Sequence, residues 1–335
     1  MLVMALAATG GVQAAPKDKA KETAQHAKVV KYWTPKRMAN AVPRDFAKKN
    51  GKFVPAARGG NPGKPPKDPG DGGDGGDGGD ALAVTGADWT GGGSDGGAVQ
   101  QATGKVFFTM GGRDYTCSGA VVNDATEVES LVLSAGHCIY DESNDEFATN
   151  WMFIPNYEDS TFKGCDHDEL GCHSAHGGDL YVHPQYASAS SFNSQAVRHD
   201  WGFARVSDPG ETDLDELVPA FGIEFSDLPE HRYSFGYPAD RPYDGQRLIY
   251  CAGNVISDPG MDGDTWGMRC DMTPGSSGGP WMKEFSGSSG TLNSVNSYGY
   301  RGGQLKDYMF GPKFGSKTEA VYDAATGNGG NAESN

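Results

Sequence analysis

Three short phrases, far apart in the chain, constrain its fold more than any other feature. They read Ser-Ala-Gly-His-Cys at 134–138, His-Asp-Trp-Gly-Phe-Ala at 199–204 and Gly-Ser-Ser-Gly-Gly at 275–279. Between them they present His137, Asp200 and Ser277, with 63 residues from the first to the second and 77 from the second to the third. No helix or hairpin spans such distances, so only a fold in which distant loops meet can bring these side chains together.

The three residue types form a known chemical set. A serine hydroxyl is a weak nucleophile until an imidazole takes its proton, and a carboxylate holds that imidazole in the correct tautomer. Backbone N–H groups of Gly275 and Ser277 would stabilise the negative charge on an attacked carbonyl oxygen. Taken singly, each phrase has a simpler interpretation as a flexible turn, a packed histidine or a strand-edge carboxylate, since the chain has 50 glycines. Their occurrence together and in this order favours catalysis.

The order His, Asp, Ser and the surrounding residues resemble those of chymotrypsin-like serine proteases. The resemblance implies an all-β fold of two packed antiparallel β-barrels with the active site in the crevice between them, barrel 1 at about 98–206 and barrel 2 at about 216–314. Short apolar runs bounded by Gly, Asn, Asp and Pro, without a sustained helical period, agree with an all-β class. These runs lie at 106–110, 119–122, 131–134, 151–154 and 248–251.

Departures from the animal digestive enzymes of this family bear on activation. Ser276 stands where those enzymes have the aspartate that pairs with a newly cut N-terminus, so that route of activation is not expected here. The phrase Cys-Asp-Met-Thr-Pro-Gly at 270–275 is similar to the bacterial glutamyl-endopeptidase-like branch. In that branch, maturation removes a pro-segment.

The cleavage preference is less constrained. Asp271 lies six residues before Ser277, where trypsin-like members carry the carboxylate that binds Lys or Arg, although the bacterial branch also has Asp there while cutting after Glu. Acid-specific members place a histidine where this chain has Asn296. We therefore expect cleavage after Lys or Arg, with a Glu-specific or broad-specificity enzyme as the alternative. Residues Ser297, Tyr298 and Gly299 are expected to pair with the substrate backbone as an added strand.

Six cysteines fit an oxidising compartment and allow about 15 pairings. The resembled family bridges the positions of Cys117 and Cys138. We further expect one bridge from Cys251 to Cys270 and another from Cys165 to Cys172. The loop 165–173 also holds enough sulfur, imidazole and carboxylate to bind zinc, but its spacing is no zinc signature and oxidised sulfurs are not ligands, so we expect no metal and no cofactor.

The chain divides by composition. An apolar run followed by small residues predicts a secretory signal peptide at 1–15, and hence an extracellular protein. Residues 16–58 resemble a bacterial pro-segment, and 59–97 are so rich in Gly, Asp and Pro that we expect a flexible linker. Its Asp-Gly repeats at 71–80 lack the apolar position of a calcium-binding repeat, and calcium binding stays an open alternative. A loose tail is expected at 315–335.

The net charge limits the kinds of partner, and the order of the three motifs limits the class of enzyme. The net charge of −16 argues against nucleic acid and anionic membranes. The expected partners are protein or peptide substrates and the chain's own pro-segment. The order His, Asp, Ser excludes an α/β-hydrolase esterase, whose order is Ser, Asp, His. The remaining alternative is a non-catalytic protease homologue that acts as a binding protein, although such proteins typically lose one of the three residues.

Overall fold

A computed structural model describes residues 19–56, 83–94, 96–124, 130–158, 165, 170–207 and 213–335. The expected signal peptide and the Asp-Gly repeats at 71–80 lie outside these residues. Strands dominate the described chain, as the apolar runs predicted.

The first body is one sheet of nine strands. Its strands are β1 (Val42–Pro43), β5 (Thr103–Met110), β6 (Arg113–Val122), β7 (Ser130–Ser134), β10 (Thr149–Pro155), β11 (His173–Ser174), β12 (Leu180–Val182), β13 (Gly202–Val206) and β22 (Glu333–Ser334). They lie in the order β11-β10-β5-β6-β7-β13-β12-β22, with β1 beside β6. All eight residues of β5 are buried, because Val106, Phe107 and Phe108 belong to the main hydrophobic cluster. A short pair, β8 (Tyr140–Asp141) and β9 (Glu146–Phe147), flanks this sheet.

The second body contains two sheets. The first has the order β19-β18-β14-β15-β4 and the second the order β16-β17-β21-β20-β2-β3. The strands are β2 (Phe46–Lys49), β3 (Lys52–Pro55), β4 (Val84–Asp88), β14 (His231–Gly236), β15 (Ile249–Asn254), β16 (Ile256–Ser257), β17 (Thr265–Arg269), β18 (Pro280–Ser286), β19 (Ser289–Val295), β20 (Tyr298–Tyr300) and β21 (Tyr308–Pro312). Together the two curled bodies give the expected all-β architecture.

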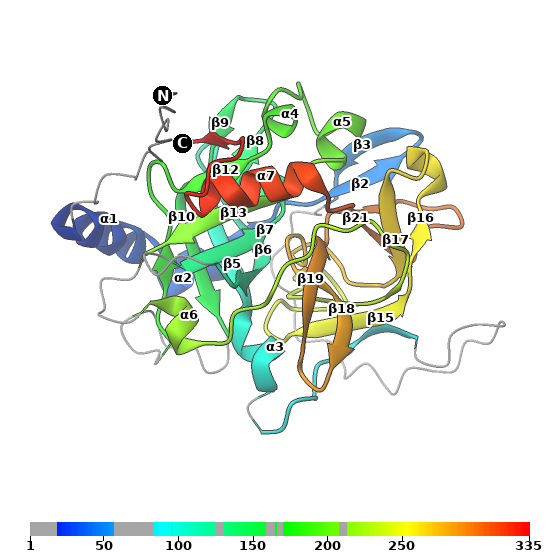
Figure 1. Ribbon diagram of the computed structural model, residues 1–335, viewed down its shortest axis with the longest axis horizontal. Helices are drawn as coiled ribbons and strands as arrows, with labels where there is room; N and C mark the ends of the chain where they lie inside the picture. The colour runs from blue at the N-terminus through cyan, green and yellow to red at the C-terminus, as the bar shows by residue number, and fades with distance from the viewer. Residues whose placement is uncertain are drawn as a thin grey trace, which may run out of the picture.

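Helices are short and lie outside the sheets (Figure 1). They are α1 (Lys19–Tyr32), α2 (Pro35–Asn40), α3 (Gly97–Ala102), α4 (Pro184–Ala187), α5 (Ser194–Val197), α6 (Leu214–Leu217) and α7 (Ser316–Ala325), with 3-10 turns η1 (Gly136–Cys138) and η2 (Pro259–Met261). Thr34 shows how local chemistry sets a boundary: its hydroxyl accepts from the N–H of Arg37, and Pro35 occupies the first helical position of α2. No helix in the described ranges is both long and apolar enough to cross a bilayer.

The N-terminal segment, defined here as residues 19–56, lies along both bodies (Figure 1). Trp33 is buried against Phe107 and donates its indole N–H to the carbonyl of Asn150 at 2.6 Å, which fixes the end of α1 on the first body. Further along, β1 pairs with β6 and β2 pairs with β20. These are the two parallel pairings among the named strands, since every other pairing of named strands in the described chain is antiparallel.

Two stretches differ from the expectations. The tail expected to be loose from residue 315 instead forms α7, because Val321 and Ala325 give it an apolar face that is buried in the main cluster. Its last residues form β22, which pairs with β12. Within the expected linker 59–97, residues 84–88 form β4 along β15, and Trp89 packs against Phe235.

Three disulfides tie loops to strands. They join Cys117 to Cys138, Cys165 to Cys172 and Cys251 to Cys270, which are the pairs expected above. The described residues contain no free cysteine.

Candidate active site

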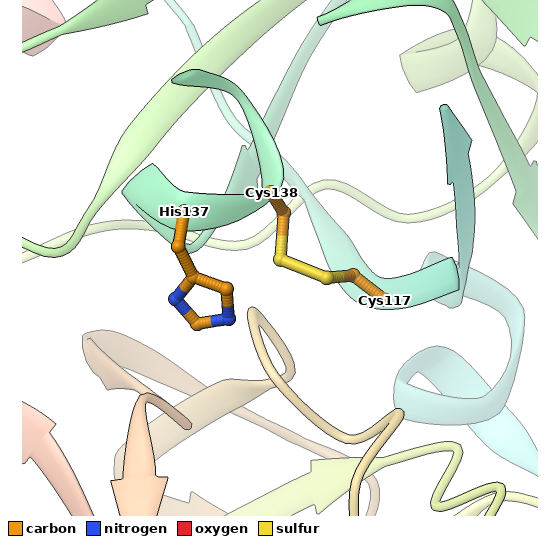
Figure 2. Close-up of side chains that lie close together, drawn as sticks. All are labelled: Cys117, His137 and Cys138. Atoms are coloured by element: carbon orange, nitrogen blue, oxygen red, sulfur yellow. A yellow bond between two sulfur atoms is a disulfide. The ribbon is translucent and has the colours of Figure 1, made fainter. Parts of the chain in front are cut away.

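The structure brings His137 and Asp200 into direct contact. His137 lies in η1, just after β7, and the neighbouring Cys138 is tied by its disulfide to Cys117 on β6 (Figure 2). Asp200 directly precedes the loop into β13, the strand that pairs with β7. The imidazole Nδ1 of His137 lies 2.8 Å from Asp200 Oδ2, and its backbone N–H donates to Oδ1 at 2.8 Å. Both side chains are 0% exposed, so the carboxylate fixes the orientation of the ring in a site without water access.

A third group binds the same carboxylate. The hydroxyl of Ser297 donates to Asp200 Oδ2 at 2.5 Å, although Ser297 precedes β20 in the second body. The sequence predicted Ser297 as part of the substrate-binding edge, and the structure shows a side chain that links the two bodies through Asp200. No local sequence pattern predicts this contact, because the two residues are 97 positions apart.

Ser277 lies in a tight turn that only small residues can form. Gly275 and Gly278 have φ values of +106° and +81°, a region that favours glycine. A Cβ on Gly278 would lie 2.4 Å from the carbonyl oxygen of Ser118, and one on Gly279 would lie 2.0 Å from that of Phe235. The turn therefore packs directly against backbone of both bodies, which holds the backbone of Ser277 in place.

Asn296 holds this turn in place, a role that its sequence position did not predict. Its buried side-chain N–H₂ donates to the carbonyls of Phe235 and Ser276 at 2.9 and 3.1 Å. Its side-chain oxygen accepts from Ser234 and from the indole of Trp281, both at 2.7 Å. With every polar group of the amide used, Asn296 connects the turn to β14 and β18.

The hydroxyl of Ser277 is bonded to a residue that sequence reasoning missed. It donates to Asp45 Oδ1 at 2.6 Å, and the N–H of Gly275 donates to Oδ2 of the same carboxylate at 2.8 Å. The N–H of Ser277 also bonds to Asp45. Burial raises the pKa of Asp45 above its ordinary value, while His137 and these hydrogen bonds oppose the shift. The imidazole Nε2 of His137 is buried and has no hydrogen-bond partner among the described residues.

The predicted specificity residue lies in a different setting. Asp271 is exposed, and its Oδ1 accepts from the hydroxyl of Tyr243 at 2.6 Å. Its backbone N–H donates to the carbonyl of Thr85 in β4, where a Cβ on Gly86 would collide with the carboxylate. Although Asp271 is exposed by surface area, the groups packed around its carboxylate partly desolvate it, and this, with a smaller contribution from the charge of Asp307, raises its pKa. No hydrogen bond joins Asp271 to His137, Asp200 or Ser277 in the described structure.

The expected substrate-binding edge is already paired. Tyr298 and Gly299 lie in β20, whose partner is β2 of the N-terminal segment, with Phe46 opposite Tyr298 and Ala47 opposite Gly299. The edge is therefore occupied by a strand of the same chain, and its pairing with a substrate stays a prediction.

Potential metal ligands gather around His137. The imidazole and the sulfurs of Cys117 and Cys138 lie within 4.8 Å of one another. Figure 2 shows the two sulfurs joined to each other beside the ring. Oxidised sulfurs lack the free thiolates that bind zinc, so this group does not fit a metal. The same holds for the sulfurs of Cys165 and Cys172, while most of the loop between them lies outside the described residues.

Comparisons with known proteins agree with this geometry. The model of the lysyl endopeptidase C-terminal domain family matches residues 91–186. Protease Anisep from Arthrobacter nicotinovorans is 36% identical over 68% of this chain and 95% of that protease, with a TM-score of 0.58. A thermostable serine protease, AL20, from an extremophilic microorganism has the same identity, TM-score and coverage of this chain, and 98% of that protease is covered. A Glu endopeptidase matches at 17% identity over 72% of this chain and 96% of its own, with a TM-score of 0.54, and so shares the fold. No curated protein matched the chain.

Proposed function

Because the chain belongs to the chymotrypsin-like serine proteases of bacteria, we propose that it cleaves peptide bonds through an acyl-enzyme with His137, Asp200 and Ser277 as the catalytic triad. The observation that carries this assignment is the buried contact between the His137 imidazole and the Asp200 carboxylate. In this pair Nδ1 is occupied, which leaves Nε2 as the atom that takes a proton from a nucleophile.

The reaction follows from these positions. Ser277 Oγ attacks the substrate carbonyl carbon, and its proton passes to His137 Nε2. The negative charge on the carbonyl oxygen is stabilised by the N–H groups of Gly275 and Ser277, which already bind a carboxylate in this structure. The imidazolium then protonates the leaving amine, the C–N bond breaks, and water releases the acyl group by the reverse sequence.

We assign Asp271 to recognition of a Lys or Arg side chain. Among the described residues no cation forms an ion pair with its exposed carboxylate, and the neighbouring Asp307 adds negative charge. A cationic guest would relieve this repulsion, whereas a glutamate side chain would increase it. The family model matched at residues 91–186 carries the name of a lysyl endopeptidase, which supports the same preference. Asn296, fully engaged with the Ser277 turn, offers no positive charge to an acidic guest.

We further propose that the enzyme acts outside the cell. Three disulfides are stable in an oxidising compartment and rare in a bacterial cytoplasm. Mass spectrometry of the protein from culture medium would give the residue at which its mature form begins.

The central test compares the matured enzyme with its Ser277→Ala variant on peptides that differ only in Lys, Arg, Glu or Phe before the cleaved bond. We expect cleavage after Lys and Arg, and a loss of about 10⁴-fold or more in Ser277→Ala. Asp271→Asn should lower kcat/KM for the Lys peptide by about 10- to 100-fold. Asp262→Asn, at an exposed turn, is the matched control. Cleavage after Glu would refute the Asp271 assignment, and unchanged activity in Ser277→Ala would refute the triad.

A further inference from the structure

Residues 42–56 pass directly over the proposed catalytic groups. The Arg44 guanidinium donates to the backbone carbonyl of His137, and the next residue, Asp45, bonds to Ser277. The ring of Phe46 then meets the His137 ring edge-on, at 5.5 Å between centroids. Ser277 is only 1% exposed, so the two catalytic groups are closed off from solvent in this state.

We propose that residues 42–56 are a built-in inhibitor, in which the Asp45 carboxylate occupies the oxyanion site and ties up the nucleophile until the segment is released. The inference rests on the proposed function, since it takes Ser277 as the nucleophile. It goes further in two ways. The oxyanion site is assigned a ligand, the carboxylate of a side chain, and Asp45 in the N-terminal segment is assigned a regulatory role.

The carboxylate reproduces the interactions of a reaction intermediate. A substrate carbonyl oxygen that becomes negatively charged would accept from the N–H groups of Gly275 and Ser277. Asp45 Oδ2 accepts from Gly275 at 2.8 Å, and the N–H of Ser277 binds the same group. Both oxygens of the Asp45 carboxyl group act as acceptors here, Oδ2 for the Gly275 N–H and Oδ1 for the Ser277 hydroxyl, so one side chain occupies the oxyanion site and binds the nucleophile together.

The segment blocks the site without offering a bond to cleave. The group facing Ser277 is a side chain, and the backbone carbonyl of Asp45 is turned away to accept from the N–H of Ala56 at 2.7 Å. In addition, β2 runs parallel to β20, whereas β20 pairs antiparallel with its other neighbour, β21. The carbonyl carbon of Asp45 is therefore not presented to the nucleophile.

The same contacts interrupt the triad. The Ser277 hydroxyl donates its hydrogen bond to Asp45 Oδ1 at 2.6 Å, and His137 Nε2 has no partner in the described structure. General-base catalysis needs a hydrogen bond between the nucleophile and that nitrogen. Release of Asp45 would free the Ser277 side chain to turn towards His137, while His137 and Asp200 need not move.

Aromatic and polar contacts hold the segment in place. Phe46 stacks on Phe192 at 4.0 Å, and Phe53 on β3 meets both Phe192 and Tyr298 edge-on. At the end of β3, the Arg301 guanidinium donates to the carbonyls of Pro55 and Ala56 at 2.8 and 2.6 Å. In the sheet of the second body, β2 lies next to β20 and β3 forms the edge, and Figure 1 shows the two strands on the same side of the molecule as β16, β17 and β21. A hairpin held this way stays docked while it is covalently attached, because attachment gives it a high effective concentration.

The test uses the full chain with a specific protease site inserted within residues 57–82, so that the segment can be cut from the rest at will. The probe is a fluorophosphonate, which reacts with activated serines, and the readout is the rate of labelling of Ser277, followed by intact mass. The variants are Asp45→Ala and the isosteric Asp45→Asn. Glu22→Gln on α1 is the matched loss of a carboxylate outside residues 42–56.

We expect the uncut wild type and Glu22→Gln to label slowly. Both Asp45 variants should label about 10- to 100-fold faster without any cut, since neither alanine nor asparagine offers two acceptor oxygens to Gly275 and Ser277. Cutting and diluting the wild type should raise its rate to a similar level. Hydrogen exchange at residues 298–300 should quicken in parallel, which reports undocking even where a variant is less stable.

Three outcomes would count against the inference. Equal, fast labelling of the uncut and cut wild type would overturn it and leave the proposed function standing. Fast labelling of the cut wild type with slow labelling of both folded Asp45 variants would show that the segment blocks the site without Asp45, which also overturns it. No labelling of any form, cut or uncut, would refute Ser277 as the nucleophile and the inference with it.

Discussion

The two halves of the proposed catalytic site are held by different parts of the molecule. His137 and Asp200 are fixed by the first body, by the disulfide at Cys138 and by the hydroxyl of Ser297. Ser277 has its hydroxyl bonded to Asp45, which lies 232 residues earlier in the chain. The base half is therefore complete in this structure, while the nucleophile half is bound to the N-terminal segment.

This difference separates two kinds of substitution. A change in the base half should damage the chemistry whether or not the N-terminal segment is docked. A change in the segment should alter access to Ser277 and leave the chemistry of the released enzyme unaffected. The four predictions below test this division.

The largest effect is expected from Asp200→Asn. An amide would donate to Nδ1 or hold the imidazole in the wrong tautomer, so we expect kcat to fall by about 10⁴-fold. The loss should be the same after the segment has been cut and diluted away, because the hydrogen bonds of Asp200 go to His137 and Ser297, which both lie outside the N-terminal segment. Steady-state kinetics on a Lys peptide measures this, with Asp262→Asn as control. A loss below about tenfold would contradict the role given to Asp200.

Ser297→Ala should have the next largest effect. It removes one hydrogen bond to a buried charged carboxylate, which corresponds to about a 10- to 100-fold fall in kcat. Because the side chain bonds to Asp200, KM should change little, and Ser297→Thr should restore part of the rate. A change confined to KM would instead support the role expected from sequence, in which this residue belongs to the substrate-binding edge.

The proposed triad could be predicted from the sequence because each of its residues lies in a recognisable local motif. The His137, Asp200 and Ser277 phrases carry recognisable neighbours, and the small residues around Ser277 are required by close backbone packing. Asp45 has no such neighbours: it is one acidic residue in a Lys-rich segment, and its partner is set by the docking of β2 along β20. A contact that depends on how two distant strands pair leaves no pattern in either one.

The tail and the linker were missed for a different reason. Composition over 315–335 is dominated by Ala, Gly and Asn, which outweighed the apolar face of α7 formed by Val321 and Ala325. In the linker, Val84–Asp88 is a short strand that forms only because β15 offers it an edge. In both places tertiary contacts decided the structure, and average composition concealed the few residues that make them.

Phe46→Ala tests whether a change in the N-terminal segment alters access to Ser277 without altering the chemistry. The half-buried ring packs on both His137 and Phe192, and its loss should favour undocking by about five- to thirtyfold, seen as faster fluorophosphonate labelling of the uncut chain. Once the segment has been cut and diluted away, wild type and variant should have the same kcat/KM. Lys49→Ala, an exposed position at the end of the same strand, serves as control. A difference that persists in the released enzymes would place Phe46 in the chemistry itself.

The smallest effect concerns pH. Burial raises the pKa of docked Asp45, so its protonated form favours docking. The contribution is fully present below the ordinary pKa of an aspartate and is lost as pH rises through the raised pKa of the docked state. In the uncut chain, the labelling rate of wild type divided by that of Asp45→Asn should therefore increase with pH and then level off. A ratio that falls with increasing pH would mean that the charged carboxylate is the better inhibitor, because its hydrogen bonds and the nearby imidazole would then outweigh the cost of burying it.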